Sequence, residues 1–162
     1  MKKEFYLLFI IATAFTACNN KAPNGMYVGF EEMSSVTPHD SLNKWYHKNN
    51  LSIEGDSVFL YQSPVAINKS DTSYSVSDGG FYYFSGLIEL KGNSVSIDLL
   101  QTGCDYCGEP VKINKDGSLT KLKVTKKLSG TFDKTGLKLN GLAYKKVEIN
   151  KENYVPHHPP GY

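Results

Sequence analysis

Hydrophobic and polar residues alternate along most of the chain after residue 25, with the period of two that is typical of β-strands. Polar residues occupy the positions between the apolar ones. The clearest apolar sets are Val95, Ile97 and Leu99, then Val111 and Ile113, then Leu137 and Leu139. Because successive side chains of a strand point to opposite faces, each set predicts a strand with one face on the core and the other in water.

Turn-forming residues separate these runs. Gly55-Asp56, Gly92-Asn93 and Asp116-Gly117 have the composition of two-residue hairpin turns, which require residues that tolerate positive φ. Asp78-Gly79-Gly80 and residues 133–136 are typical of slightly longer hairpin loops. Five successive hairpin signals predict an all-β protein, an antiparallel meander of about eight strands.

A meander of this kind closes most simply into an up-and-down barrel, because closure leaves no unpaired strand edge. We therefore expect a single β domain over residues 25–150, with a two-sheet sandwich as the alternative architecture. Residues 40–48 depart from the alternation, since their apolar side chains share one face at helical spacing behind an Asp-Ser cap, which predicts a short helix. The proline-rich residues 151–162 predict an irregular C-terminal tail.

The start of the first predicted strand resembles that of lipocalin-like domains. Gly25-Met26-Tyr27 matches their glycine-x-aromatic opening, and the barrel pattern extends the resemblance over the domain. Lipocalins prefer tryptophan at this aromatic position and pack an arginine across it, whereas this chain has Tyr27 and no arginine. The resemblance implies the up-and-down barrel architecture.

The N-terminus has the order of a bacterial secretion signal. Lys2 and Lys3 precede a mainly apolar run from Phe5 to Phe15, which small residues follow. The run has 11 residues, whereas a membrane-spanning helix needs about 20. Residues 1–17 are therefore predicted to be a cleaved signal peptide.

Residues 15–18, Phe-Thr-Ala-Cys, resemble a lipobox, the motif whose cysteine becomes the acylated first residue of a bacterial lipoprotein. The resemblance implies palmitate on Cys18, and several acyl chains together hold a protein stably on a membrane. Residues 18–24 would then be the lipidated cysteine and a linker, with ordinary signal-peptide cleavage as the alternative. The start also resembles lipoproteins of Bacteroidota, and Asn19 favours the outer membrane, on its periplasmic face.

Charge is unevenly divided, although the formal net charge is only +2. Residues 19–111 hold 5 lysines against 11 acidic residues, a balance of −6, whereas residues 112–151 hold 11 lysines against 3, a balance of +8. We interpret most of these lysines as outward residues of alternating strands, with a basic face toward anionic lipid or a polyanionic polymer as the alternative. Since arginine is the usual bidentate reader of phosphate and base edges, its absence argues against a nucleic-acid partner.

Cys104 and Cys107 remain once Cys18 is assigned to the lipid. An oxidising envelope favours a structural disulfide between them, across a loop at 101–110. The Cys-x-x-Cys spacing leaves a catalytic dithiol and a metal site as alternatives, although redox motifs of this kind open a helix after a strand. We predict neither a metal nor another cofactor, because metal-ligand spacing is missing from all four histidines, His39, His47, His157 and His158.

Aromatic residues are the remaining candidates for binding. Rings with an apolar body and a polar tip suit stacking on a sugar or lining a pocket. The candidate ligand-facing residues are Trp45, Tyr46, Tyr74, Phe81, Tyr82 and Tyr83. The alternative is that these rings pack in the core or in cross-strand pairs. No serine elbow and no distinct acid–base pair is present, so we assign no catalytic residue.

Together these patterns predict a lipid-anchored envelope protein with a non-enzymatic barrel that binds a small apolar or glycan ligand, or an envelope protein. An accessory or inhibitor protein acting through a surface loop is the alternative, and a hydrolase or thiol oxidoreductase is the third possibility. Asp40-Ser41-Leu42 and Asp56-Ser57-Val58 also resemble the O-glycosylation sequon of Bacteroidota, which would place sugars on Ser41 and Ser57.

Overall fold

The computed structural model describes residues 23–33, 42–76, 80–108 and 110–150. These residues form eleven strands: β1 (Gly25–Glu32), β2 (Asn43–Glu54), β3 (Ser57–Asn68), β4 (Tyr74–Val76), β5 (Phe81–Lys91), β6 (Ser94–Asp105), β7 (Val111–Ile113), β8 (Leu119–Lys121), β9 (Thr125–Phe132), β10 (Gly136–Leu139) and β11 (Leu142–Val147). Nine strands belong to one sheet, and β7 and β8 form a separate two-stranded sheet.

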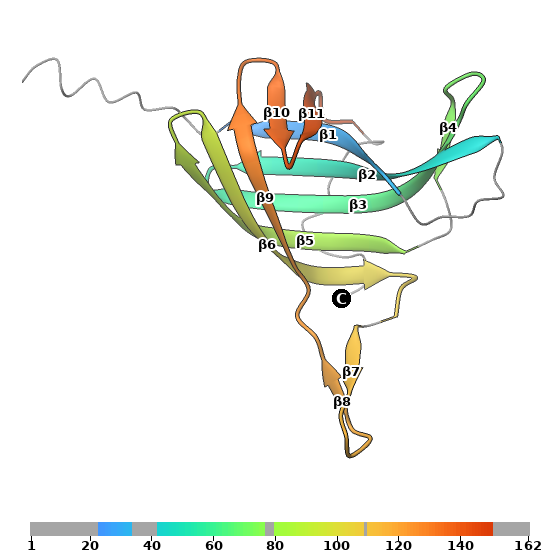
Figure 1. Cartoon of the computed structure of the whole chain (residues 1–162). Helices are drawn as coiled ribbons and strands as arrows, with labels where there is room; N and C mark the ends of the chain where they lie inside the picture. The colour runs from blue at the N-terminus through green and yellow to red at the C-terminus, as the bar shows by residue number, and fades with distance from the viewer. Residues whose placement is uncertain (1–22, 34–41, 77–79, 109, 151–162) are drawn as a thin grey trace, which may run out of the picture.

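The large sheet closes into a barrel (Figure 1). Its strand order is β2-β1-β11-β10-β9-β6-β5-β3-β4, and pairing between β2 and β3 joins these strands into a ring of eight, with β4 as an extra strand on β3. Every pairing in the ring is antiparallel. Apart from β4 and the β7–β8 hairpin, neighbours in the ring follow one another in the chain, and the last strand, β11, pairs with the first, β1. This is up-and-down topology. The predicted all-β meander and barrel are confirmed, and the fold is consistent with a lipocalin-like barrel.

Most of the predicted turns join the strands on either side of them. Gly55-Asp56 joins β2 to β3, Gly92-Asn93 joins β5 to β6, and Asp116-Gly117 joins β7 to β8. Residues 133–135 join β9 to β10. A further turn at Asn140-Gly141 joins β10 to β11, with φ of 49° and 83°, and was not predicted. Asparagine followed by glycine is a strong two-residue hairpin signal, so the sequence did contain the information.

The predicted helix at residues 40–48 is wrong. Residues 43–48 belong to β2, in which every residue from Asn43 to Glu54 pairs with β3 and most also pair with β1. Backbone pairing on both sides outweighs a weak helical spacing of apolar residues, because propensity is only a mild bias against tertiary contacts.

Two further predictions are corrected by the strand pairing. Asp78-Gly79-Gly80 does not close a hairpin, since β4 and β5 each pair with β3 and residues 77–79 lie outside the described part. Val111 and Ile113 are not half-buried core residues. They lie in β7, on a hairpin that projects from the barrel (Figure 1), and are 42% and 72% exposed.

Some predictions concern residues that the structure does not describe. The signal peptide (1–17), the lipidated Cys18 and the tail (151–162) are among them. Of the two glycosylation candidates, Ser41 is also outside the described residues, whereas Ser57 is exposed at the start of β3.

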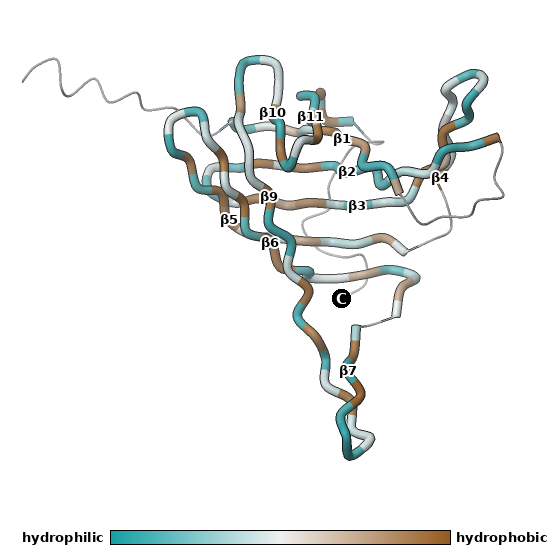
Figure 2. Tube along the Cα trace, viewed as in Figure 1, coloured by the Kyte–Doolittle hydropathy of each residue, from teal (hydrophilic) through white to brown (hydrophobic). Residues whose placement is uncertain are grey.

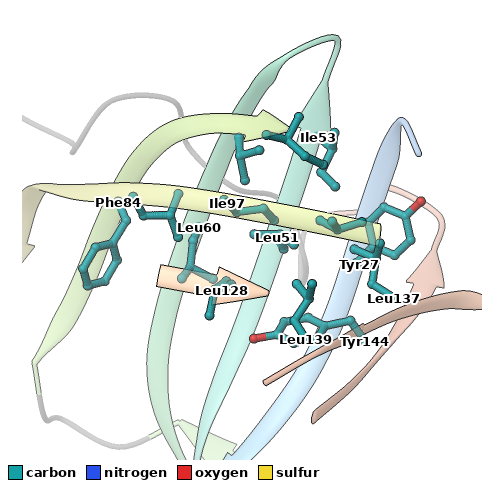
Figure 3. Close-up of a cluster of buried hydrophobic side chains, with 14 residues drawn as sticks. Tyr27, Leu51, Ile53, Leu60, Phe84, Ile97, Leu128, Leu137, Leu139 and Tyr144 are labelled. Carbon is teal, nitrogen blue, oxygen red and sulfur yellow. The ribbon is translucent and has the colours of Figure 1, made fainter. Parts of the chain in front are cut away.

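Apolar side chains fill the barrel interior around its middle and toward the end where β1 begins (Figure 3). The buried cluster consists of Tyr27, Leu51, Ile53, Val58, Leu60, Phe84, Ile88, Val95, Ile97, Leu99, Leu128, Leu137, Leu139 and Tyr144. These residues sit at alternate positions of their strands, as the period-two pattern predicts. Their removal from water, at about 25 cal/mol per Å² of apolar surface, is the main stabilising contribution to the fold.

Tyr27 connects this core to the end of the barrel. Its hydroxyl donates a hydrogen bond to the carbonyl oxygen of Pro23 at 2.7 Å. The Nζ of Lys146, from the last strand, lies 5.9 Å from the centre of its ring. A lysine of the last strand is therefore placed against the aromatic residue across which lipocalins pack an arginine, and the contact has the geometry of a cation–π pair.

Two glycines lie at points where neighbouring strands approach closely. A Cβ atom added to Gly86 would collide with the backbone carbonyl of Asp98, and one added to Gly130 would collide with that of Lys138. Glycine inside a strand is typical of sharp bends in small barrels, where another backbone comes near.

Replacing Gly86 with alanine should destabilise the barrel, because backbone cannot move aside as the end of a side chain can. We expect Gly86→Ala to lower the free energy of unfolding by about 1–3 kcal/mol, measured by urea denaturation. Glu89→Ala, at an exposed position of the same strand, is the control and should stay within about 0.5 kcal/mol of the wild type. Equal midpoints for the two variants would contradict the close approach at Gly86.

Candidate functional site

The inward face of the barrel changes from apolar to polar along its length. On β1, β2, β3 and β9 the inward positions beyond the apolar core carry Glu31, His47, Asn49, Gln62 and Lys126. We call these five residues the polar cluster. They lie two or four positions along their strands from core residues and therefore share the inward face.

Two atoms of the polar cluster are buried without a hydrogen-bond partner. Gln62 Nε2 donates to Asn49 Oδ1 at 2.8 Å, but Asn49 Nδ2 and His47 Nδ1 have no partner with hydrogen-bond geometry among the described residues. The Asn49 side chain is nevertheless close enough to the Tyr144 phenol to lower its pKa. Asn49 is fully buried. A third such atom, Asn50 Oδ1, belongs to the opposite face of β2. Leaving a buried polar atom unsatisfied costs about 1–3 kcal/mol, so such atoms normally bind water or a ligand.

An ion pair crosses the edge of the polar cluster. Lys126 Nζ lies 3.2 Å from Glu31 Oε2, which links β9 to β1 although β10 and β11 separate them in the sheet. The two side chains are 24% and 49% exposed, so water screens the attraction and the pair contributes little to stability. Its effect is to place one positive and one negative group near the imidazole of His47.

His47 is uncharged at neutral pH in this environment. Burial lowers the pKa of its imidazole below the usual 6.5, and the positive charge of Lys126 acts in the same direction. Glu31 acts in the opposite direction and does not reverse the shift. A neutral imidazole has one donor and one acceptor nitrogen, so Nδ1 can serve either purpose for a ligand.

Tyr144 forms the boundary between the polar cluster and the apolar core. Its ring lies over Gly29, where an added Cβ would come within 2.9 Å of the ring. Gly29 pairs with Asn49 in the β1–β2 ladder, so the ring lies next to that amide. Burial and the charge of Glu31 raise the pKa of Tyr144, whereas the side chain of Asn49 acts to lower it. The phenol is therefore neutral and can donate a hydrogen bond.

The aromatic residues predicted to face a ligand do not gather at one place. Trp45 and Tyr82 are at inward positions, and Tyr82 packs partly against the apolar core. Tyr46 is at an outward position of β2, and Tyr74 lies in the extra strand β4. The polar cluster was not predicted at all.

The remaining two, Phe81 and Tyr83, belong to a row of rings on the outer face with Tyr61 and Tyr106. Tyr61 stacks on Phe81 at 6.1 Å and contacts Tyr83 at 5.2 Å, and Tyr106 meets the edge of Phe81 at 6.1 Å. The Tyr83 hydroxyl donates to Asp105 Oδ2 at 2.7 Å, and Tyr83 is buried. Only Tyr106, 85% exposed, presents most of its surface to solvent.

A disulfide holds the loop that carries Tyr106. The structure joins Cys104 to Cys107, the pairing that the sequence analysis favoured, and Tyr106 between them has a φ of 58°. Positive φ is uncommon for a bulky residue and indicates local strain. The β7–β8 hairpin follows this loop and carries hydrophobic residues away from the barrel (Figure 2). Ile113 and Leu119, which pair with each other on it, are 72% and 64% exposed.

Within the described residues, no group of three or more histidine, cysteine, aspartate or glutamate side chains is placed to hold a metal ion. The same part of the chain has no helix long and apolar enough to cross a membrane. Comparisons with protein-family models, with curated proteins and with solved structures found no match. The class of the protein therefore comes from its own topology, a closed eight-stranded antiparallel barrel with a polar cluster inside one end.

Stability should depend on pH through His47. Because its pKa is lower in the folded protein, the unfolded chain binds more protons as pH falls through 6.5. The free energy of unfolding should therefore be fully retained above pH 6.5 and decline as pH is lowered below that value. Urea denaturation of the wild type and of His47→Gln, from neutral pH to about pH 5, should give a shallower decline for the variant.

The other three histidines are present in both proteins and cancel in this comparison. Parallel declines for the wild type and His47→Gln would show that the imidazole is not held neutral by burial.

Proposed function

We propose that the protein is a lipid-anchored lipoprotein of the bacterial envelope whose barrel binds a small polar ligand of the glycan class at the polar cluster. The observation that carries this proposal is the pair of buried, unpartnered atoms, Asn49 Nδ2 and His47 Nδ1, on the inward face of β2. A polar ligand in the barrel would supply these two atoms with the partners that the described residues do not.

The chemistry of the polar cluster favours a glycan over an apolar ligand. Asn49 Nδ2 is a donor, the neutral imidazole of His47 offers one nitrogen of either kind, and sugar hydroxyls both donate and accept. An apolar ligand would leave both atoms buried and unsatisfied. Because Glu31 and Lys126 neutralise each other, the cluster has no net charge, which favours a neutral ligand.

The side chains of the polar cluster favour ligand binding over catalysis. Glycoside hydrolysis commonly uses two carboxyl groups on either side of the bond, whereas the polar cluster contains only Glu31, which is paired with Lys126. It contains no serine or cysteine nucleophile. The neighbouring phenol of Tyr144 has a raised pKa, so it stays protonated at neutral pH and is not available as a base.

The N-terminal sequence supports attachment to the outer membrane on its periplasmic face. The seven residues 18–24, which precede Gly25, can reach about 23 Å at about 3.3 Å per residue. Gly25 begins β1 at the apolar end of the barrel, opposite to the polar cluster. A lipid on Cys18 would hold the apolar end near the membrane and leave the polar cluster turned toward the periplasm.

Lipidation is tested by replacing Cys18. Cells fed a clickable palmitate analogue should label the wild type and not Cys18→Ser, which should accumulate as an unprocessed precursor. Cys104→Ser with Cys107→Ser is the control and should label fully. Label retained on Cys18→Ser would reject the anchor.

Ligand binding is tested with a chain from residue 19 onward, which contains every barrel strand. A panel of neutral mono- and oligosaccharides is titrated while the side-chain amide signals of Asn49 and Gln62 are followed by nuclear magnetic resonance. We expect these two signals to shift together, and Asn49→Ala to weaken binding about 5- to 150-fold through loss of a buried hydrogen bond.

The control for this titration is Asn114→Ala. Asn114 bonds to Ser118 and Thr120 in the β7–β8 hairpin, far along the chain from the polar cluster, and its loss should leave affinity unchanged. If no sugar moves the Asn49 and Gln62 signals but a fatty acid does, the ligand is apolar and the proposed class is wrong.

A second candidate function is that of an accessory or inhibitor protein acting through the β7–β8 hairpin. Exposed apolar residues on a projecting element, here Ile113 and Leu119, are typical of a surface that docks on a partner. A variant with both replaced by serine separates the two functions, since it should keep sugar binding and lose any activity that depends on such a partner.

A further inference from the structure

A groove lies on the outer face of the barrel over β9, β10 and β11. Its volume is about 490 Å³. Its lining includes the small residues Gly136 and Ala143, which add little bulk, and the lysines Lys138, Lys145 and Lys146. We call this feature the basic groove.

The basic groove has an excess of positive charge. Among the described residues, neither Lys138 nor Lys145 takes part in an ion pair. The acid in its lining is Asp133, whose Oδ1 accepts hydrogen bonds from Thr135 N at 2.7 Å, Thr135 Oγ1 at 2.6 Å and Gly136 N at 3.2 Å. Lys138 and Lys145 are outward, whereas Lys146 has an inward position opposite Tyr27 and reaches solvent at the rim of the barrel. Three lysines against one aspartate leave the lining with a net charge of +2, which suits a phosphate-bearing ligand.

Strand alternation accounts for the lysines but not for their convergence. Lys138 and Lys145 are at outward positions of β10 and β11, as the sequence pattern predicts. The turn at Asn140-Gly141 folds β11 back on β10, and the β10–β11 register places Gly136 opposite Lys145. Outward residues that are separate in the sequence therefore line a single groove.

The basic groove lies at the end of the barrel where β1 begins. Met26 pairs with Val147 and Tyr27 with Lys146, so the end of β11 runs beside the start of β1. The lysines of the β7–β8 hairpin, Lys112 and Lys121, lie beyond the other end of the barrel (Figure 1). The chain therefore has two separate basic regions.

We propose that the basic groove binds the phosphate head groups of anionic phospholipids in the membrane that holds the lipid anchor. The barrel then stands with its apolar end on the membrane and its polar cluster directed away from it. This inference rests on the lipid anchor of the proposed function, which supplies the reason for a membrane at this end of the barrel. The positive charge of the basic groove is complementary to a surface of phosphate groups, which favours a phospholipid membrane as its partner.

The experiment uses the chain from residue 19 onward, which has no lipid, and vesicles of phosphatidylcholine alone or mixed with phosphatidylglycerol. We expect binding to the mixed vesicles only. Each lysine near an anionic surface contributes about fivefold to binding. Replacing Lys138, Lys145 and Lys146 together with glutamine should therefore weaken binding on the order of 100-fold.

A matched variant removes the same charge from the other basic region, by replacing Lys112, Lys115 and Lys121 with glutamine. It should bind the mixed vesicles as the wild type does. Since Lys146 contacts Tyr27, a variant with only Lys138 and Lys145 replaced serves as a second measurement, with an expected loss of about 25-fold. Equal losses in the groove and hairpin variants would overturn the proposal, because attraction would then follow total charge.

Inorganic phosphate distinguishes the membrane from a soluble source of the same chemistry. If phosphate displaces the protein from the vesicles no better than chloride does at equal ionic strength, the groove binds a surface of head groups. Selective displacement would show that the groove reads free phosphate and would overturn the membrane assignment. Vesicle binding and the labelling of Cys18 are independent measurements. A wrong proposal for the basic groove and a wrong proposal for the lipid anchor therefore give different outcomes.

Discussion

Closure of the barrel depends on the contact between its first and last strands. β1 and β11 pair over only three positions, from Met26 to Val28, whereas β2 and β3 pair over twelve. Without this contact the sheet would have two free edges and its apolar face would be open to water. Beyond Val28, β1 leaves β11 and is linked instead to β9 through the Glu31–Lys126 ion pair. The shortness of the pairing thus brings polar residues of β1 and β9 together inside one end of the barrel.

The strands and most turns could be predicted from the sequence because each depends on local chemistry. Period-two alternation identifies a strand, and Gly-Asp, Gly-Asn or Asn-Gly identifies its turn. Alternation cannot say whether a strand joins the ring. Val111 and Ile113 have the same spacing as Val95 and Ile97, yet the first pair is exposed on a hairpin and the second is core. The difference lies in long-range pairing, which a short pattern does not contain.

The polar cluster was missed for a related reason. Its residues come from four strands, and Glu31 and Lys126 are 95 positions apart in the chain. On β2 a signal was present, since the inward positions run from Leu51 back to polar Asn49 and His47. The erroneous helix over residues 40–48 concealed it. Attention to aromatic content was misleading as well, because alternation sends neighbouring rings such as Tyr82 and Tyr83 to opposite faces.

The β7–β8 hairpin leaves and rejoins the barrel at one point. Leu100 pairs with Thr125, and Gln101 N donates to Val124 O at 2.9 Å, so β6 and β9 are neighbours whatever connects them. The connection is therefore a module whose length and sequence can change while the ring stays closed. A barrel built in this way can acquire new partners by exchange of the hairpin alone. A foreign peptide loop grafted between Pro110 and Leu122, whose backbones are joined by a hydrogen bond of 2.8 Å, would be displayed on an unchanged scaffold.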